Sequence, residues 1–314
     1  MGVDLSVSVG TVRLKNPLLL ASGCCGYGLD MEPYLDLSRL GGVCLKGLSL
    51  SGSEGNPPPR IWETRGGMIN AIGLQNIGVE AFLREKAPLL RKVDTLFVAN
   101  FYGHTLEEYA EAARLLGGEP CLGALEMNVS CPNIQAGGIH FGTDPDVLFR
   151  VTEACRKATS KPLWVKLSPN VSDPVAVARA AEAAGADALS CTNTLPAMAI
   201  DVERRTFRIA NKVGGLSGPA LKPVALRIAF QVSRAVKIPV VGIGGIATAE
   251  DALEFLLAGA SAFQVGTALF VDPSCPYAIL EGIEEYCRRH GFSGVEALRG
   301  ALREDEGGEI RCSG

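Results

Sequence analysis

The sequence predicts an α/β fold in which eight parallel strands alternate with helices, a (β/α)8 TIM barrel. Two observations support this prediction. Eight short apolar runs recur along the 314-residue chain, and longer amphipathic segments with helical spacing separate them. The runs are apolar throughout, which is typical of parallel strands that are buried on both faces. Because such a barrel takes about 250 residues, we expect residues 1–314 to form one domain.

The chain is expected to begin with a β-hairpin, because residues 3–14 alternate apolar and polar side chains about Gly10. We expect this hairpin to close the bottom of the barrel. The eight apolar runs that follow it are the predicted strands. They span residues 17–21, 43–45, 95–99, 122–127, 163–167, 186–191, 238–243 and 262–265.

Capping residues mark helices between these strands. Asp173 and Pro174 suit the N-cap and the first position of a helix, and Gly185 suits its end. Thr248 and Asp251 form an approximate capping box at the start of a later helix. Helices placed between consecutive parallel strands are what the barrel requires.

Three connections are longer than a minimal barrel needs. They span residues 49–78, which are rich in Gly, Pro and Ser, residues 129–144, and residues 193–218, which are compatible with a hairpin around 201–208. All three follow predicted strand ends. We therefore expect long loop insertions at the C-terminal face of the barrel, where such insertions usually cover a ligand.

Polar residues and glycines follow all eight predicted strands. In a barrel these strand ends meet at one mouth, where the active sites of this fold lie. Each residue alone has a structural explanation, since a lysine can snorkel and glycines end many strands. Together they predict a reaction site, because buried lysines and amides need partners. The residues are Ser22, Gly23, Lys46, Gly47, Asn100, Asn128, Cys131, Lys166, Thr192, Asn193, Thr194, Gly244, Gly245, Gly266 and Thr267.

The exit from the fourth strand, residues 126–133, has the most unusual composition of the eight. The apolar run 121–127 opens there into two asparagines, a serine and Cys131. Taken alone, Cys131 has two open explanations, a small buried hydrophobic residue or a reactive thiol. The convergence of the other strand ends favours the reactive thiol.

The glycine turns after the seventh and eighth strands, at 244–245 and 266–267, each lead into a predicted helix start. Glycines let backbone N–H groups approach an anion, and helix N-termini favour negative charge. Barrels frequently bind phosphate with these two loops. The turns therefore predict a phosphorylated ligand or cofactor.

Composition and charge narrow the classes of function. The net charge of −4 argues against a nucleic-acid partner, which normally needs a basic face. We expect no membrane span and no secretory signal, since no run reaches about 18 apolar residues. The ten cysteines include no C-x-x-C pair, so we expect no metal site here and a reducing cytoplasm. The three scattered histidines argue against histidine-based catalysis.

Six short motifs occur in order along nearly the whole chain. They are Ala-Ser-Gly-Cys-Cys-Gly-Tyr-Gly (21–28), Gly-Asn-Pro-Pro-Pro-Arg (55–60), Met-Ile-Asn-Ala-Ile-Gly-Leu-Gln-Asn (68–76), Asn-Val-Ser-Cys-Pro-Asn (128–133), Val-Lys-Leu-Ser-Pro-Asn (165–170) and Gly-Leu-Ser-Gly-Pro-Ala (215–220). Together they resemble the motifs of class 1 dihydroorotate dehydrogenases. The Cys of the fourth motif is specific to class 1, and the Ile-Gln-Ala-Gly-Gly-Ile-His-Phe-Gly that follows it resembles the 1B subclass. The pair Cys24 and Cys25 departs from the family's pattern.

The resemblance implies FMN as the phosphorylated cofactor. A cation such as Lys166 near the pyrimidine edge of the flavin would stabilise negative charge on the reduced ring. The implied FMN contacts are Ser22, Lys46, Gly47, Asn100, Asn128, Lys166, Thr192, Gly218, Gly244, Gly245, Gly266 and Thr267. The implied dihydroorotate contacts are Lys46, Asn70, Ala71, Ile72, Gly73, Leu74, Asn128, Asn133, Asn193 and Thr194.

The implied reaction is the oxidation of (S)-dihydroorotate to orotate in de novo pyrimidine (UMP) biosynthesis. Cys131, as the catalytic thiolate, would take the C5 proton while a hydride leaves C6 for FMN. A nearby cation or amide dipoles can lower a thiol pKa of about 8.5 toward neutrality. The amides of Asn70, Asn128 and Asn193 offer donors and acceptors to a ring with alternating C=O and N–H groups. Lys46 would neutralise the substrate carboxylate.

The 1B resemblance also implies a partner subunit that carries FAD and a [2Fe–2S] cluster and passes electrons to NAD+. This chain has neither a cysteine cluster nor a Gly-x-Gly-x-x-Gly fingerprint, which agrees with that expectation. We expect a homodimer of this chain flanked by two such subunits, a heterotetramer of two plus two.

Alternatives stay open at this point. A class 1A-like enzyme would pass its electrons to fumarate. A dihydropyrimidine dehydrogenase-like flavoenzyme shares the barrel and an active cysteine but carries iron–sulfur cysteine runs, and a tRNA dihydrouridine synthase needs a basic surface. An aldolase with a Schiff base at Lys166 leaves the amides and Cys131 without a role. A flavin-storing or scaffolding subunit is the non-enzymatic alternative.

Overall fold

The eight predicted strands form one closed parallel barrel in the computed structural model, which describes residues 2–129 and 141–303. Each strand begins and ends within two residues of the predicted positions. The closed parallel barrel confirms the predicted fold class. Their side chains are almost all buried, which explains why the runs are apolar on both faces. In order around the barrel the strands are β3 (Leu18–Leu20), β4 (Gly42–Cys44), β7 (Phe97–Phe101), β8 (Leu122–Asn128), β9 (Leu163–Lys166), β10 (Ala188–Cys191), β15 (Val240–Ile243) and β16 (Ala262–Val265).

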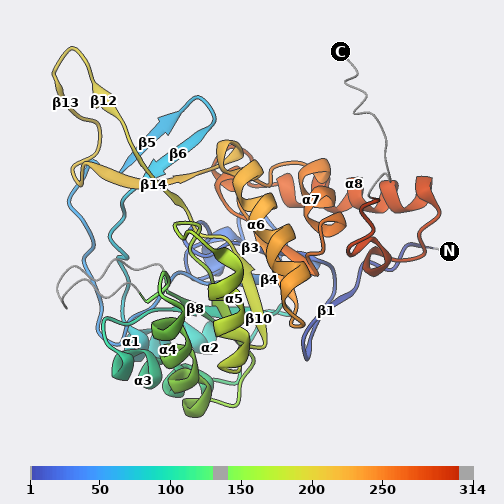
Figure 1. The fold of residues 1–314 in the computed structure, drawn as a ribbon, viewed down its shortest axis with the longest axis horizontal. Helices are drawn as coiled ribbons and strands as arrows, with labels where there is room; N and C mark the ends of the chain where they lie inside the picture. The colour runs from blue at the N-terminus through green and yellow to red at the C-terminus, as the bar shows by residue number, and fades with distance from the viewer. Residues whose placement is uncertain (1, 130–140, 304–314) are drawn as a thin grey trace.

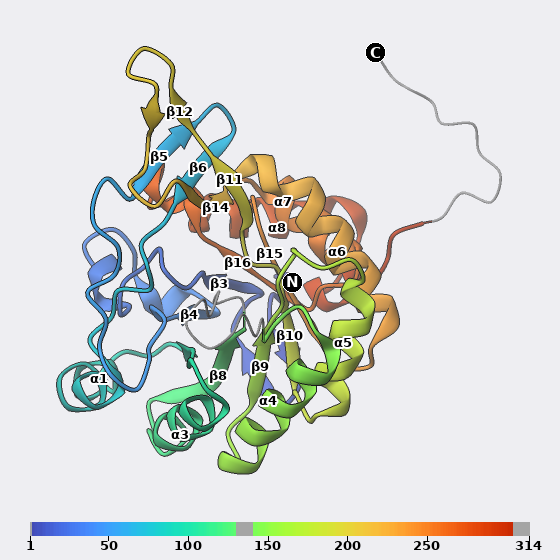
Figure 2. The same ribbon diagram turned by 60° about the vertical axis from the view of Figure 1, so that its left-hand side comes forward.

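Helices pack around the outside of the barrel (Figures 1 and 2). The predicted caps are confirmed, since Asp173 accepts hydrogen bonds from the N–H groups of Val175 and Ala176, and Thr248 and Asp251 form a capping box. The α-helices are α1 (Val79–Glu85), α2 (Ala87–Leu90), α3 (Leu106–Gly117), α4 (Pro145–Ala158), α5 (Pro174–Ala183), α6 (Lys222–Ala235), α7 (Ala249–Leu257) and α8 (Cys275–His290). Short 3₁₀ helices are η1 (Leu29–Met31), η2 (Leu37–Arg39), η3 (Pro219–Leu221), η4 (Thr267–Phe270) and η5 (Val295–Leu298).

The connection from β3 to β4 differs from a regular strand–helix unit. Residues 22–41, all of which the structure describes, carry the 3₁₀ helices η1 and η2 but no α-helix. Gly23, Gly26 and Gly28 all adopt positive φ in this segment, which an α-helix does not accommodate. The first strand therefore opens into an irregular loop at the mouth.

The predicted N-terminal hairpin is confirmed. The strands β1 (Val7–Val9) and β2 (Val12–Leu14) pair antiparallel about Gly10, whose φ is +62°. A Cβ at Gly10 would lie 3.3 Å from the carbonyl oxygen of Asp187, the residue directly before β10. The hairpin therefore closes the amino-terminal end of the barrel, opposite the mouth.

Two of the long connections combine into a second sheet, which we call the mouth sheet. Its strands follow the order β11–β14–β6–β5 and project from one side of the barrel (Figures 1 and 2). The strands are β5 (Ile61–Thr64), β6 (Gly67–Asn70), β11 (Leu195–Met198) and β14 (Val213–Ser217). The predicted hairpin around 201–208 is confirmed by the pairing of β12 (Ile200–Asp201) with β13 (Thr206–Phe207). The pairing of β6 with β14 was not predicted, because it joins segments that are far apart in the sequence.

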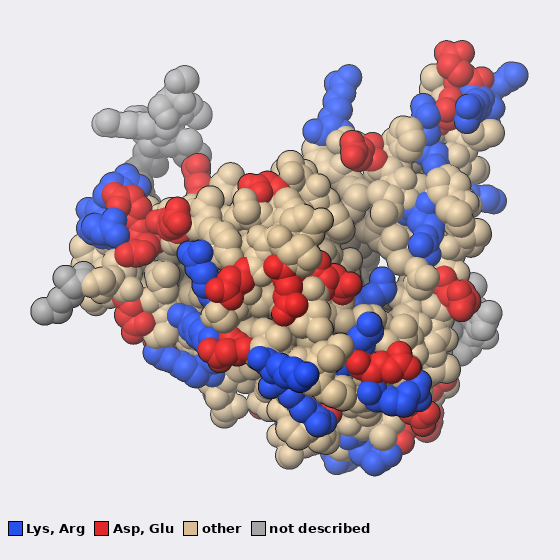
Figure 3. All heavy atoms as spheres, turned by 180° about the vertical axis from the view of Figure 1, so that it is seen from behind, with Lys and Arg blue, Asp and Glu red and all other residues tan. Residues whose placement is uncertain are grey.

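Two features of the surface bear on possible partner classes. Within residues 2–129 and 141–303, no helix has the length and apolar character needed to cross a membrane. On the face in Figure 3, basic and acidic side chains are interspersed rather than gathered into a patch of one sign. That face therefore does not present the continuous basic surface that nucleic-acid binding needs.

Candidate active site at the barrel mouth

A fully buried carboxylate, Glu126 on β8, lies inside the barrel near the mouth. It accepts hydrogen bonds from Asn100 Nδ2 on β7 at 2.8 Å, Ser190 Oγ on β10 at 2.7 Å and Gln264 Nε2 on β16 at 2.7 Å. Since β10 and β16 are not neighbours of β8, two of these bonds cross the barrel interior. Lys166 Nζ lies 3.9 Å from Glu126 Oε1. We call these five residues the Glu126 cluster.

Lys166 supplies the positive charge of the Glu126 cluster. Its side chain is only 9% exposed, and among the described residues its ammonium forms this one ion pair and no hydrogen bond. A buried ammonium has three N–H donors that need acceptors. Gln264 Oε1 is also buried without a partner in the described part of the chain. The cluster therefore keeps polar capacity for a ligand at the mouth.

Two amides meet next to the Glu126 cluster. Asn128 follows Glu126 by two residues on the same strand, so both side chains point into the barrel. Asn193 Nδ2 donates to Asn128 Oδ1 at 3.1 Å, and Asn193 Oδ1 accepts from the Thr194 N–H at 2.8 Å. The Tyr109 hydroxyl on α3 donates to the Asn128 carbonyl at 2.8 Å. The structure thus brings three predicted substrate residues together at one point of the mouth.

The first predicted glycine turn packs against the loop that precedes α6. Gly244 and Gly245 have φ of +130° and +73°, and a Cβ at Gly245 would lie 2.8 Å from the carbonyl oxygen of Gly218. The Thr192 N–H donates at 2.8 Å to the carbonyl of Ile243, the residue before the turn. Four of the residues predicted to contact the cofactor are therefore close together, although they come from two different connections.

The second glycine turn joins this group to the first strand. Gly266 caps η4, and a Cβ at Gly266 would lie 3.2 Å from the Cβ of Ala21, the residue before Ser22. A Cβ at Gly218 would lie 3.4 Å from Thr267 Cγ2. A Cβ at Gly218 would also lie 2.7 Å from the Cα of Gly67. The glycines therefore allow these loops to pack against one another more closely than other residues would.

Lys46 and Gly47 follow β4 on the other side of the mouth. A Cβ at Gly47 would lie 2.8 Å from Asn100 Oδ1, so this glycine lies directly against the Glu126 cluster. Burial and the nearby positive charge of Arg60 lower the pKa of Lys46 below its usual value. Lys46 is therefore a second cation at the mouth, and it loses its proton more readily than an exposed lysine does.

Cys24 is close enough to both lysines to feel their charges, yet it remains a neutral thiol. Burial raises the pKa of Cys24 to about 11, although the charges of Lys166 and Lys46 act in the opposite direction. Burial also raises the pKa of the other seven described cysteines. None of these eight thiols is therefore prepared to act as a base near neutral pH.

The predicted substrate loop, residues 70–74, leaves the mouth sheet beside the two amides. Asn70 Nδ2 lies 3.3 Å from the carbonyl oxygen of Gly215 on β14 and donates to it. A Cβ at Gly215 would overlap with Thr194 Oγ1. Asn70 and Thr194 therefore flank the same glycine, which places the loop close to the amide pair.

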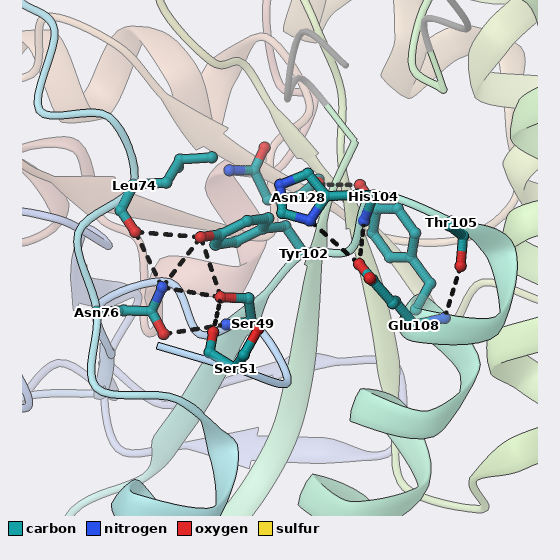
Figure 4. Close-up of polar contacts among 10 residues, drawn as sticks. Ser49, Ser51, Leu74, Asn76, Tyr102, His104, Thr105, Glu108 and Asn128 are labelled. Atoms are coloured by element: carbon teal, nitrogen blue, oxygen red, sulfur yellow. Dashed lines mark hydrogen bonds and ion pairs between the residues drawn. The ribbon is translucent and has the colours of Figure 1, made fainter. Parts of the chain in front are cut away.

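Buried polar side chains hold the far end of this loop (Figure 4). The Leu74 carbonyl accepts from Asn76 Nδ2 at 2.9 Å and from the Tyr102 hydroxyl at 3.1 Å. Asn76 Nδ2 also lies 2.9 Å from Ser49 Oγ and 3.0 Å from the Tyr102 hydroxyl. Asn76, Tyr102 and Ser49 are all buried. We call these three residues the Asn76 cluster.

Two predicted site residues, Cys131 and Asn133, lie outside the residues that the structure describes. Their roles as catalytic base and substrate contact stay predictions. The strand that leads toward them ends at Asn128, which belongs to the amide pair.

The sequence analysis missed Glu126, Asn76 and Tyr102. A signal for Glu126 was present, because a charged residue inside the apolar run 121–127 must find partners when the run is buried. Asn76 closes the motif 68–76, yet no role was assigned to it. Tyr102 directly follows β7 and carries no sequence signal that separates it from other buried tyrosines.

Comparisons with known proteins identify a family to which nearly the whole chain is similar. The family model described as dihydroorotate dehydrogenase matches residues 4–287. A protein of Trichlorobacter lovleyi is 57% identical over 298 residues, which cover 95% of this chain and 98% of that protein. Proteins of Geotalea uraniireducens and Pelobacter propionicus are each 56% identical, over 95% and 96% of this chain and 98% and 99% of their own lengths. All three relatives are named dihydroorotate dehydrogenase B (NAD(+)), catalytic subunit.

Proposed function

The chain belongs to the dihydroorotate dehydrogenase family, and from this premise we propose that it oxidises (S)-dihydroorotate to orotate in pyrimidine biosynthesis, with NAD+ as the final acceptor. The observation that carries the proposal is the grouping of Asn128, Asn193 and Thr194 beside the buried pair Lys166 and Glu126. Neutral amides suit a ring with alternating C=O and N–H groups, because they offer donors and acceptors without a charge to desolvate.

The residues at the mouth fit FMN. The ammonium of Lys166 is buried and donates no hydrogen bond to the described residues, so it can donate to a polar ring edge. The glycines at 218, 244, 245 and 266 let these loops pack closely, since a Cβ at each would crowd neighbouring protein atoms. Backbone N–H groups of glycines are also those that can approach a phosphate most closely. FMN, when bound, supplies the acceptor for the hydride that leaves C6 of dihydroorotate.

Side chains of this chain bind the substrate and remove its proton. Asn128 and Asn193 orient the pyrimidine ring, and Lys46 offers a positive charge to the substrate carboxylate. Cys131 Sγ takes the proton from C5. The eight described cysteines, including Cys24 at the mouth, have raised pKa values and do not compete for this role.

The test is anaerobic reduction of the purified chain by dihydroorotate. We expect a yellow protein whose flavin absorbance bleaches on mixing, and a Cys131→Ala variant that keeps FMN but is reduced about 10²–10⁴-fold more slowly, the usual contribution of a general base. Cys121→Ala is the matched control, because Cys121 directly precedes β8, at the opposite end of the strand from the mouth. A colourless protein, or a Cys131→Ala variant reduced at the wild-type rate, would refute the assignment.

The proposal includes a partner subunit with FAD and a [2Fe–2S] cluster, in a heterotetramer built on a homodimer of this chain. The relatives' name, catalytic subunit, supports a second kind of subunit. Within residues 2–129 and 141–303, no group of His, Cys, Asp and Glu is arranged to hold a metal. Co-purification from the native cell tests this proposal. Isolation of a solitary FMN protein that uses fumarate efficiently would contradict it.

A further inference from the structure

The side chain of Asn76 connects four segments around the mouth. Its Oδ1 accepts from the N–H groups of Ser49 at 3.2 Å and Gly78 at 2.8 Å, which fixes the orientation of the amide. Its Nδ2 faces Ser49 Oγ, the Leu74 carbonyl and the Tyr102 hydroxyl, all within 3.0 Å. Asn76 therefore joins the exit of β4, the substrate loop, the start of α1 and the exit of β7.

Leu74, at the end of the substrate loop, has an unusual backbone conformation. Its φ is +57°, directly after Gly73 with a φ of +75°. A non-glycine residue seldom adopts this left-handed conformation and keeps it only where its surroundings hold it. The hydrogen bonds that its carbonyl accepts from Asn76 and Tyr102 are the contacts that hold it.

The loop that is held in this way presents unused backbone donors. The N–H groups of Ile72, Gly73 and Leu74 make no hydrogen bond to the residues that the structure describes, although the loop is only partly exposed. Consecutive backbone N–H groups near a left-handed residue form a concavity that accepts an anion. The orientation of these donors depends on the conformation at Gly73 and Leu74.

Tyr102 is the anchor of this arrangement on the barrel. It is 1% exposed and directly follows β7, and its N–H donates to the Leu48 carbonyl at 2.9 Å. Its ring and that of His104 pack in a T-shaped arrangement, with the ring centres 5.7 Å apart. Figure 4 shows its hydroxyl pointing toward Leu74, Asn76 and Ser49. A rigid strand end thus fixes one oxygen next to the carbonyl of the substrate loop.

We propose that Tyr102 and Asn76 are positioning residues for dihydroorotate, which act by holding the backbone at Ile72–Leu74 so that its N–H groups meet the substrate carboxylate. This inference rests on the proposed function and extends it to residues that touch no substrate atom. Neither residue takes part in proton or hydride movement. Their loss therefore weakens substrate binding and leaves the chemical step intact.

The test is the Tyr102→Phe variant, which removes one oxygen and keeps the ring. We expect KM for dihydroorotate and Kd for orotate to rise roughly three- to tenfold, the range for the loss of the one hydrogen bond that the hydroxyl donates to the Leu74 carbonyl. FMN content and kcat at saturating substrate, measured with a dye acceptor, should stay at wild-type values. A fold-wide defect would lower kcat and FMN content as well, so this split separates positioning from a structural role.

Tyr277→Phe is the matched control. The Tyr277 hydroxyl accepts from the Asp36 N–H at 2.6 Å. Asp36 Oδ1 accepts from the N–H of Ser38, and the Ser38 carbonyl accepts from Lys15. Since Lys15 precedes β3, this region lies near the start of that strand and away from the mouth. Loss of this hydroxyl should leave KM unchanged.

Ser49→Ala provides a second measurement on the Asn76 cluster, and a smaller rise in KM than in Tyr102→Phe is expected from it. An unchanged KM in Tyr102→Phe, or an equal rise in Tyr277→Phe, would overturn the inference. Wild-type protein that neither bleaches with dihydroorotate nor binds orotate would refute the proposed function instead, so the two failures are distinguishable.

Discussion

The Glu126 cluster and the Asn76 cluster are both buried at the mouth, yet they are built in opposite ways. The Glu126 cluster joins five barrel strands through one carboxylate and one ammonium. The Asn76 cluster joins three connecting segments through neutral amide, hydroxyl and backbone groups. The hydrogen bonds to the carboxylate are 2.7 or 2.8 Å long, whereas those of the Asn76 side chain, shown in part in Figure 4, range from 2.8 to 3.2 Å.

This difference shows where the fold places charge. A buried carboxylate is tolerated only when several donors are fixed around it, because its desolvation is costly. Strand positions in a closed barrel supply such fixed donors. A loop that must meet a ligand has less rigid surroundings, and neutral groups there carry a smaller penalty if the geometry shifts. In these two clusters, the charged groups therefore lie on the strands and the neutral hydrogen bonds lie in the connections.

Glu126→Ala should have the largest effect on stability. The substitution leaves Lys166 buried without its counter-charge and leaves the donors of Asn100 and Gln264 without an acceptor. Breaking a buried pair in this way costs about 3–5 kcal/mol. Urea unfolding followed by circular dichroism measures the change. A loss below about 1 kcal/mol would mean that water or relaxation replaces the carboxylate, and the proposed difference between the clusters would fail.

Two further variants support that measurement. Glu126→Gln keeps the volume and one acceptor, so it should lose less stability and remain folded if the alanine variant does not. Glu111→Ala is the control for loss of a glutamate, since Glu111 forms an exposed ion pair with Arg114 on α3. It should leave the unfolding midpoint unchanged.

Asn76→Ala should have an intermediate effect. It leaves the N–H groups of Ser49 and Gly78 without their acceptor, and the Leu74 carbonyl loses one of its two donors. No charge is left unpaired, so we expect a loss of about 2 kcal/mol, within the range for buried unsatisfied polar groups. The same urea titration measures it. A loss larger than that of Glu126→Ala would reverse the comparison.

The two clusters also differ in how far the sequence predicts them. The strands, the hairpins and the meeting of Lys166, Asn100 and Asn128 at one mouth follow from apolar runs and from the rule that parallel strand ends converge. The sequence contains a signal for Glu126, because it is a charged residue inside an apolar run that is predicted to be buried. Its partners were not, because Ser190 and Gln264 reach it across the barrel interior.

Sequence patterns do not reveal the contacts of the Asn76 cluster or the pairing of β6 with β14. These contacts join residues from connections whose paths are set by tertiary packing, and short glycine-rich strands such as β14 carry no clear period. The absence of an α-helix after β3 has a local cause in its positive-φ glycines, which a count of strand–helix units overlooks. Periodicity thus predicts the scaffold better than it predicts the loops.

A pair of serine substitutions compares the clusters directly. Ser190→Ala removes one donor to the Glu126 carboxylate, and Ser49→Ala removes one hydroxyl that accepts from the Asn76 amide. Hydrogen bonds to charged groups contribute about 1.5–3 kcal/mol, and neutral ones about 0.5–1.5 kcal/mol. Ser190→Ala should therefore be the more destabilising of the two by about 1 kcal/mol in urea unfolding. Equal losses would show that the charge of Glu126 adds nothing to its hydrogen bonds.

The smallest expected effect concerns Lys46, a cation at the mouth on which the positive charge of Arg60 acts more strongly than the carboxylate of Asp30. Burial and Arg60 lower the pKa of Lys46 from its usual 10.5 in the folded protein. Between the lowered pKa and 10.5 the unfolded chain binds more protons than the folded chain, so this group makes stability rise with pH in that window. Lys46→Met removes the contribution. The stability of the wild type relative to Lys46→Met should therefore increase from about pH 8 to about pH 10 in parallel urea titrations. Arg60→Gln should reduce that increase, because the pKa of Lys46 then moves back toward 10.5. A difference between wild type and Lys46→Met that stays constant with pH would show that this lysine, like an exposed one, is not destabilised by its surroundings.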